Sequence, residues 1–73
     1  MLKRKVKLQI EAKKNELDMN LANNYKDLAH DALKELDAMV EELKNNGALK
    51  EKDYTKLREM TDGYKRKMAN YHH

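Results

Sequence analysis

The 73-residue chain contains no cysteine, proline, phenylalanine or tryptophan, and it has only two glycines. The absence of cysteine excludes a disulfide framework and a thiolate metal site, and it favours a reducing, intracellular setting. A chain this short buries only about 60% of its unfolded surface, and here no cross-link adds to its stability. We therefore expect one marginally stable domain, for which self-association or partner binding is a natural source of further stability.

Long apolar runs are also missing. No stretch approaches the roughly 18 consecutive apolar residues of a membrane span. The basic start, residues 1–5, is not followed by the uninterrupted apolar core of a secretion signal. Charged residues make up 40% of the chain, which together with the few turn-forming residues is typical of long solvated helices. We expect a cytoplasmic, all-α protein with no membrane partner.

Apolar residues at steps of three and four predict a first helix over about residues 2–22. Its stripe consists of Leu2, Val6, Ile10, Leu17 and Leu21, with Lys13 or Lys14 at the one missing position. Leu8, Ala12 and Met19 fall on nearly the opposite side and form a second, thinner apolar strip, called the outer strip below. The outer strip is covered by the third helix or by a partner, or it is ordinary exposed surface.

A second helix is predicted over about residues 25–45. Asn24 followed by Asp27 imitates a capping box, and Gly47 suits the left-handed position that ends a helix. The stripe between these signals is Tyr25, Leu28 or Ala29, Ala32 or Leu33, Leu36, Val40 and Leu43. If Asn23 and Asn24 are instead helical, the first two helices fuse into one rod of about forty residues, since the apolar phase is unbroken there.

A third helix is predicted over about residues 50–70, with Glu51 and Asp53 in the first turn, where the helix dipole favours acids. Its apolar repeat is Tyr54, Leu57, Met60 or Thr61, Tyr64, Met68 and Tyr71. Gly63 interrupts this repeat at a cost of about 1 kcal/mol relative to Ala, which makes it a candidate kink or premature end. The last few residues are expected to fray.

Short connections make neighbouring helices antiparallel, so the favoured architecture is an antiparallel three-helix bundle formed by residues 1–73 as one helical domain. Its core lacks large aromatic residues other than tyrosine. A long helical hairpin that dimerises through its exposed apolar residues is the alternative.

The net charge of +3 is unevenly distributed. Residues 1–15 carry six Lys or Arg against one acid, residues 16–45 carry three against eight, and residues 46–73 carry seven against four. In an antiparallel bundle we expect the basic start of the first helix to lie beside Glu41 and Glu42. We expect the basic run 65–67 to lie near Glu16, Asp18 and Asp27, so that much of the charge is neutralised internally.

Two basic clusters suggest nucleic-acid binding as an alternative function. They are Lys3, Arg4, Lys5 and Lys7 near the start of the chain, and Lys65, Arg66 and Lys67 near its end. Counterion release requires several cations on one surface, whereas a three-helix bundle places these clusters at opposite ends.

Catalytic patterns are missing. His30 lies beside Asp27 and Asp31, but the chain has no Ser or Cys for such a pair to activate. The inward-facing Glu-x-x-His pattern of diiron bundles and a Gly-rich phosphate loop are also absent. His72 and His73 are adjacent, so their side chains point apart on a helix. We predict no catalytic, metal, cofactor or small-molecule site.

Ile10-Glu11, followed by Leu33-Lys34-Glu35-Leu36-Asp37 in a two-helix hairpin, resembles the small aspartyl-phosphate phosphatases that oppose the sporulation phosphorelay. The resemblance covers about half of the chain. Their Ser-Gln-Glu-Leu-Asp motif is matched only at Glu35, Leu36 and Asp37, with Leu33 and Lys34 in place of Ser and Gln. No function is carried over from this family.

The favoured function is a protein-interaction module whose partner is another protein or a second copy of the chain. The predicted contacts are the outer strip and Tyr71, because Tyr and Met are enriched at protein contacts. The composition resembles short bacterial and phage products, among them inhibitors of host enzymes. An acidic face formed by Asp27, Asp31, Glu35 and Glu42 would imitate a phosphate backbone if it stays unpaired.

Overall fold

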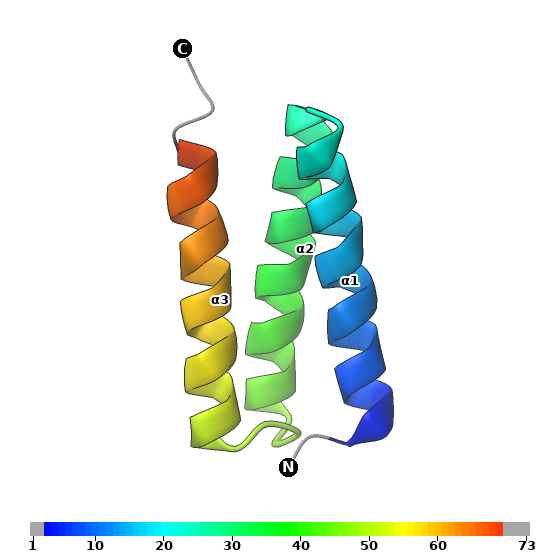
Figure 1. The fold of residues 1–73 in the computed structure, drawn as a ribbon. Coiled ribbons are helices and arrows are strands. Elements are labelled where there is room, and N and C mark those ends of the chain that lie inside the picture. Colours follow the sequence, from blue (N-terminus) through cyan, green and yellow to red (C-terminus); the bar gives the residue numbers. More distant parts are fainter. Residues whose placement is uncertain (1–2, 70–73) are drawn as a thin grey trace.

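The computed structural model describes residues 3–69, and this part of the chain forms three helices. They are α1 (Arg4–Ala22), α2 (Lys26–Asn45) and α3 (Glu51–Ala69). Figure 1 shows the chain rising through α1, returning through α2 and rising again through α3. The all-α, helical-bundle prediction is confirmed, whereas the predicted fraying of the last residues lies outside the described range.

The connection between α1 and α2 is a tight turn closed by backbone hydrogen bonds. The Tyr25 N–H donates to the Asn20 carbonyl at 2.8 Å and the Asn24 N–H donates to the Leu21 carbonyl at 3.2 Å. This pair of bonds is a Schellman motif, with Asn24 in the left-handed conformation at φ 60. The fused rod is therefore not formed.

The predicted capping box is wrong. Asn24 closes the end of α1 instead of beginning α2, and the residue that precedes α2 is Tyr25, whose side chain makes no capping hydrogen bond. Asn tolerates the left-handed conformation better than most other non-glycine residues, so it suits the position that closes the C-terminal end of a helix.

The connection between α2 and α3 begins with the same motif, built on glycine as predicted. Gly47 has φ 81, its N–H donates to the Lys44 carbonyl at 3.1 Å, and the Ala48 N–H donates to the Leu43 carbonyl at 2.9 Å. Both turns satisfy carbonyl groups at a helix end.

The core lies mainly between α1 and α2. Its buried members on these two helices are Ile10, Leu17, Leu21, Ala29, Ala32, Leu33, Leu36 and Val40. Ala29 and Ala32 of α2 are fully buried, and their small side chains let the helices approach closely. Leu49, in the connection before α3, is also buried.

Helix α3 contributes much less to this core. Only Thr61 and Met68 are buried, and the Thr61 hydroxyl donates to the Arg58 carbonyl at 3.0 Å. Of the two residues predicted for this position of the apolar repeat, Thr61 is therefore the buried one and Met60 is half-buried. The helix continues through Gly63, so the premature end considered there does not occur.

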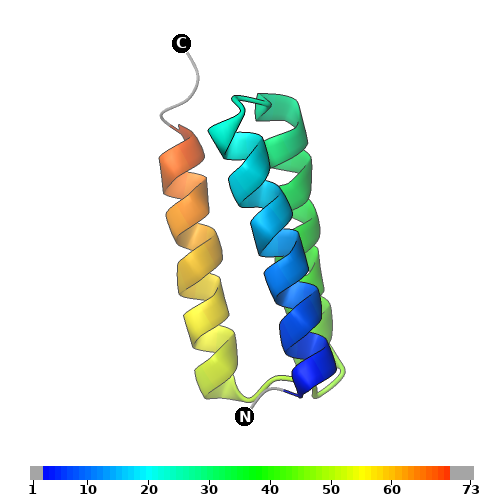
Figure 2. The ribbon, with the colours of Figure 1, turned by 45° about the vertical axis from the view of Figure 1, so that its right-hand side comes forward.

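Polar contacts attach α3 to α2. Arg58 contacts Asp37 at 3.0 Å and Glu41 at 3.2 Å, and Lys65 contacts Asp37 at 3.2 Å. The Tyr54 hydroxyl also donates to Glu41 at 2.7 Å. Residues later in α3 thus meet residues earlier in α2, as the opposite directions in Figures 1 and 2 require.

Helix α3 does not lie close to α1. Within residues 3–69 no Cα atom of one helix is within 8 Å of a Cα atom of the other. Their polar link is the Tyr64 hydroxyl, which donates to the Asp18 carboxylate. Burial, this hydrogen bond and the nearby charge raise the pKa of Tyr64 well above its usual value.

The predicted charge neutralisation is wrong in its details. Lys65 pairs with Asp37, and no described residue of the run 65–67 pairs with Glu16, Asp18 or Asp27. Glu41 is engaged by α3 and not by the basic start of α1. The rotation of each helix, which decides these partners, is not specified by the order of charges along the sequence.

Candidate interaction surfaces

The outer strip of α1 is exposed. Leu8 is 55% exposed and Met19 is 62% exposed, and Ala12 between them is exposed as well. These residues lie on the side of α1 away from Ile10 and Leu17, which face the core. Helix α3 therefore does not cover the outer strip.

Two further large apolar residues are exposed, Tyr25 at 54% and Leu28 at 54%. The predicted place of Tyr25 in the core stripe of α2 is therefore wrong, and of the two alternatives at the next position, Leu28 or Ala29, it is Ala29 that is buried. Leu28 and Ala29 both fit helical spacing, so the periodicity alone did not separate them. Among residues 3–69, all the exposed large apolar side chains belong to α1, α2 or the turn between them.

A groove of about 400 Å³ runs between α1 and α2 and is called the lateral groove below. It is lined by Gln9, Ala12, Lys13, Glu16, Met39, Glu42, Leu43 and Asn46. Met39 and Leu43 are half-buried and pack against the core, so they form an apolar floor between polar edges. The lateral groove cannot be predicted from the apolar periodicity of the sequence, because it depends on the way α1 and α2 pack.

The lateral groove and α3 lie on different flanks of the α1–α2 pair. On α1, Asp18 contacts α3, whereas Lys13 borders the groove about 140° away at 100° per residue. On α2, Asp37 contacts α3, whereas Glu42 borders the groove, again about 140° away. The flank that carries the groove is thus not covered by any described helix.

Lys13 links the two helices at the groove. Its ammonium contacts Glu35 at 2.6 Å and Glu16 at 3.4 Å, and only 19% of its side chain is exposed. The hydrogen bond to Glu35, together with the charges of both carboxylates, raises the pKa of Lys13. Two acids therefore share this one cation at the edge of the groove.

The predicted acidic face is exposed but not wholly unpaired. Asp27, Asp31, Glu35 and Glu42 are all exposed. Glu35 is held by Lys13, so the condition for imitating a phosphate backbone is not met at that residue.

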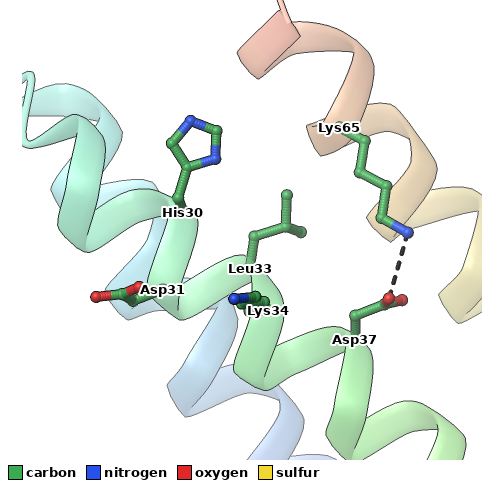
Figure 3. Close-up of a pocket in the computed structure, with 6 residues that line it drawn as sticks. All are labelled: His30, Asp31, Leu33, Lys34, Asp37 and Lys65. Carbon is green, nitrogen blue, oxygen red and sulfur yellow. Dashed lines mark hydrogen bonds and ion pairs between the residues drawn. The ribbon is translucent and has the colours of Figure 1, made fainter.

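A second groove, of about 320 Å³, lies between α2 and α3. Figure 3 shows its lining residues, His30, Asp31, Leu33, Lys34, Asp37 and Lys65. Asp31 points away from His30 in this view, and the Lys65 ammonium is turned toward Asp37. Within residues 3–69 no group of three or more His, Asp or Glu side chains is placed to hold a metal ion.

The two predicted basic clusters are exposed but lie far apart. Residues 3–7 lie at the lower end of the bundle and residues 65–67 near its upper end in Figure 1. Lys65 is also engaged by Asp37. The fold does not bring the clusters onto one surface.

The residues that carry the phosphatase resemblance have structural contacts. Leu36 is fully buried, Glu35 binds Lys13, and Asp37 binds Arg58 and Lys65. These contacts account for the three residues without a phosphatase site.

Tyr71, His72 and His73 lie outside the described residues. None of the helices in residues 3–69 is long and apolar enough to cross a membrane. No family model, curated protein or solved structure matches the chain.

Proposed function

We propose that this chain is a non-catalytic protein-interaction module that binds its partner through the α1–α2 pair, with α3 serving as a structural support. The observation that supports this proposal is the location of the exposed large apolar residues. Leu8, Met19, Tyr25 and Leu28 are each more than half exposed and all belong to the α1–α2 pair. Helix α3 exposes no large apolar residue in its described range.

The outer strip suits recognition by another helix. Leu8 and Ala12 are four residues apart and Met19 follows two turns later, so all three share one face of α1. Exposed apolar residues bordered by charged ones are typical of protein contacts. The proposal includes a regulatory or inhibitory role in the cytoplasm of a bacterium or of a phage-infected cell. Small inhibitor proteins act by binding their target and need no catalytic site, which fits a non-catalytic module.

Nucleic-acid binding remains a prediction and is the weaker of the two. The basic clusters lie at opposite ends of the bundle, and one of their members, Lys65, is paired within the chain. A single duplex would contact one cluster at a time and release few counterions.

Site-specific photo-crosslinking in cells that naturally produce the chain tests the proposed function. A photoreactive residue at Met19 is expected to give discrete protein adducts. The matched control is Lys56, an exposed position on α3. The same adducts at both positions, or none at Met19, would contradict the proposal, and adduct formation with nucleic acid at Lys5 would favour the alternative.

A further inference from the structure

We infer that the partner of the lateral groove is a second copy of this chain, with α1 of one copy packed antiparallel against α1 of the other. The inference rests on the proposed function and deepens it by naming the partner. It is based on a self-complementary row of residues on α1 at the edge of the groove.

Four exposed residues form this row, called the seam below: Lys5, Gln9, Ala12 and Glu16. Their spacing of four, three and four keeps them on one face of α1. Gln9, Ala12 and Glu16 line the lateral groove, and Lys5 continues their row toward the start of the helix. The seam therefore has a cation at one end, an acid at the other and a small residue near its middle.

An antiparallel pair of seams is complementary to itself. A two-fold axis between Gln9 and Ala12 places Lys5 of each copy opposite Glu16 of the other, and Gln9 opposite Ala12. The small side chain of Ala12 next to the axis permits close approach of the two helices. A parallel pair would instead place like charges opposite each other, so the charges select the antiparallel arrangement.

Apolar residues on both sides of the seam would be covered in such a dimer. Leu8, on the outer strip, is 55% exposed in the single chain. Met39 and Leu43 form the apolar floor of the groove. Under the two-fold axis each flank of the seam meets the same flank of the other copy, so Leu8 packs beside Leu8 of the second copy and the two grooves meet on the other side. Both contacts remove apolar surface from water, which drives association.

The acids that contact Lys13 at the edge of the groove also favour a second cation. Glu16 and Glu35 share Lys13, so each is within reach of the same cation. Lys5 of a second copy would add a second cation to this group. The flank that carries α3 has the same kind of contact within one chain. There Arg58 and Lys65 of α3 form ion pairs with acids of α2.

Sedimentation equilibrium of the full chain, from micromolar to near-millimolar concentration, tests the inference. The chain is expected to dimerise, more weakly at high salt because the seam charges are exposed. Lys5→Glu alone and Glu16→Lys alone should each raise the dimer dissociation constant about tenfold or more, because each places like charges opposite one another. Lys56→Glu on α3 is the matched charge reversal and should change nothing.

Two rescue measurements make the test specific. The double variant Lys5→Glu/Glu16→Lys should dimerise as well as the unaltered chain. An equimolar mixture of the two single variants should form a heterodimer, because every reversed charge then faces its opposite. Circular dichroism of each variant checks that helicity is unchanged.

A chain that is monomeric throughout, or a dimer that neither reversal weakens, would overturn the inference. Such a monomer could still form adducts with a different protein at Met19, which would preserve the proposed function while excluding self-association. Conversely, a dimer that the seam variants weaken supports the inference whether the Met19 adduct is the chain itself or a different protein, and the mass of that adduct distinguishes the two.

Discussion

The α1–α2 interface and the α2–α3 interface are held together by different interactions. The first buries eight apolar residues, and five of them have no exposed area: Leu17, Ala29, Ala32, Leu36 and Val40. The second buries only Met68 and a threonine, with the half-buried Leu57, Met60 and Tyr64 packed against the core. Ion pairs and hydrogen bonds through Arg58, Lys65 and Tyr54 supply the polar contacts. These ion pairs are partly exposed, so their contribution is modest and is screened by salt, whereas the contribution of apolar burial is not screened.

This difference implies unequal stability within one small domain. Helices α1 and α2 form a hairpin with most of the core, and α3 packs against α2 without approaching the backbone of α1. Regions with few buried apolar contacts open at lower free energy than the rest of a fold. We expect α3 to detach before the hairpin unfolds.

The largest expected effect is at the centre of the hairpin. Leu36→Ala removes a fully buried side chain and should lower the free energy of unfolding by about 2–5 kcal/mol. Leu57→Ala, at a half-buried position of α3, is the matched truncation and should cost clearly less. Urea denaturation followed by circular dichroism measures both, and equal losses would contradict the proposed difference between the interfaces.

A second prediction isolates the charges that hold α3. Arg58→Met keeps most of the aliphatic side chain but removes the contacts with Asp37 and Glu41. Amide hydrogen exchange should accelerate across α3 and remain nearly unchanged in the core of α1 and α2. High salt should have the same effect on the unaltered chain and a smaller one on the variant. Uniform acceleration over all three helices would show that α3 does not open separately.

A third prediction strengthens the weaker region. Gly63 lies inside α3, and a methyl group there would meet no atom within 4 Å apart from its chain neighbours and the backbone of its own helical turns. Gly63→Ala should therefore raise the stability of α3 by about 1 kcal/mol and slow its amide exchange. Gly47→Ala is the contrasting change, because Gly47 has φ 81 and alanine is strained there. A destabilising Gly63→Ala would indicate that the glycine is needed for packing.

The smallest effect concerns the link between α3 and α1. Tyr64→Phe removes the hydrogen bond to Asp18 and should cost about 0.5 kcal/mol near neutral pH, since the site is partly exposed. Because folding raises the pKa of Tyr64, the stability from its neutral form is complete below its unfolded value of 10.0 and is lost as the pH rises above it. Thermal melts above pH 10.0 should fall less steeply for Tyr64→Phe than for the unaltered chain.

The sequence predicted the helices because each has apolar residues at steps of three and four over many turns. It located the second turn because Gly47 suits the left-handed position that ends a helix. It misassigned Asn24, since asparagine suits both the start of a helix and the left-handed position after one. It did not separate Leu28 from Ala29, because neighbouring residues fit the same period within its tolerance.

The candidate surface was predictable in part. The exposure of Leu8 and Met19 follows from their angle relative to the core stripe of α1. The lateral groove and the Lys13–Glu35 contact depend on the relative rotation of α1 and α2, which the sequence pattern leaves open.

The two tight turns also affect how quickly the chain folds. Each reverses direction within a few residues, so helices adjacent in sequence pack together without closing a long loop. Helical proteins with such local contacts fold in microseconds to milliseconds. A newly made copy would therefore complete its hairpin before it encounters another molecule, and association would join preformed surfaces rather than disordered chains.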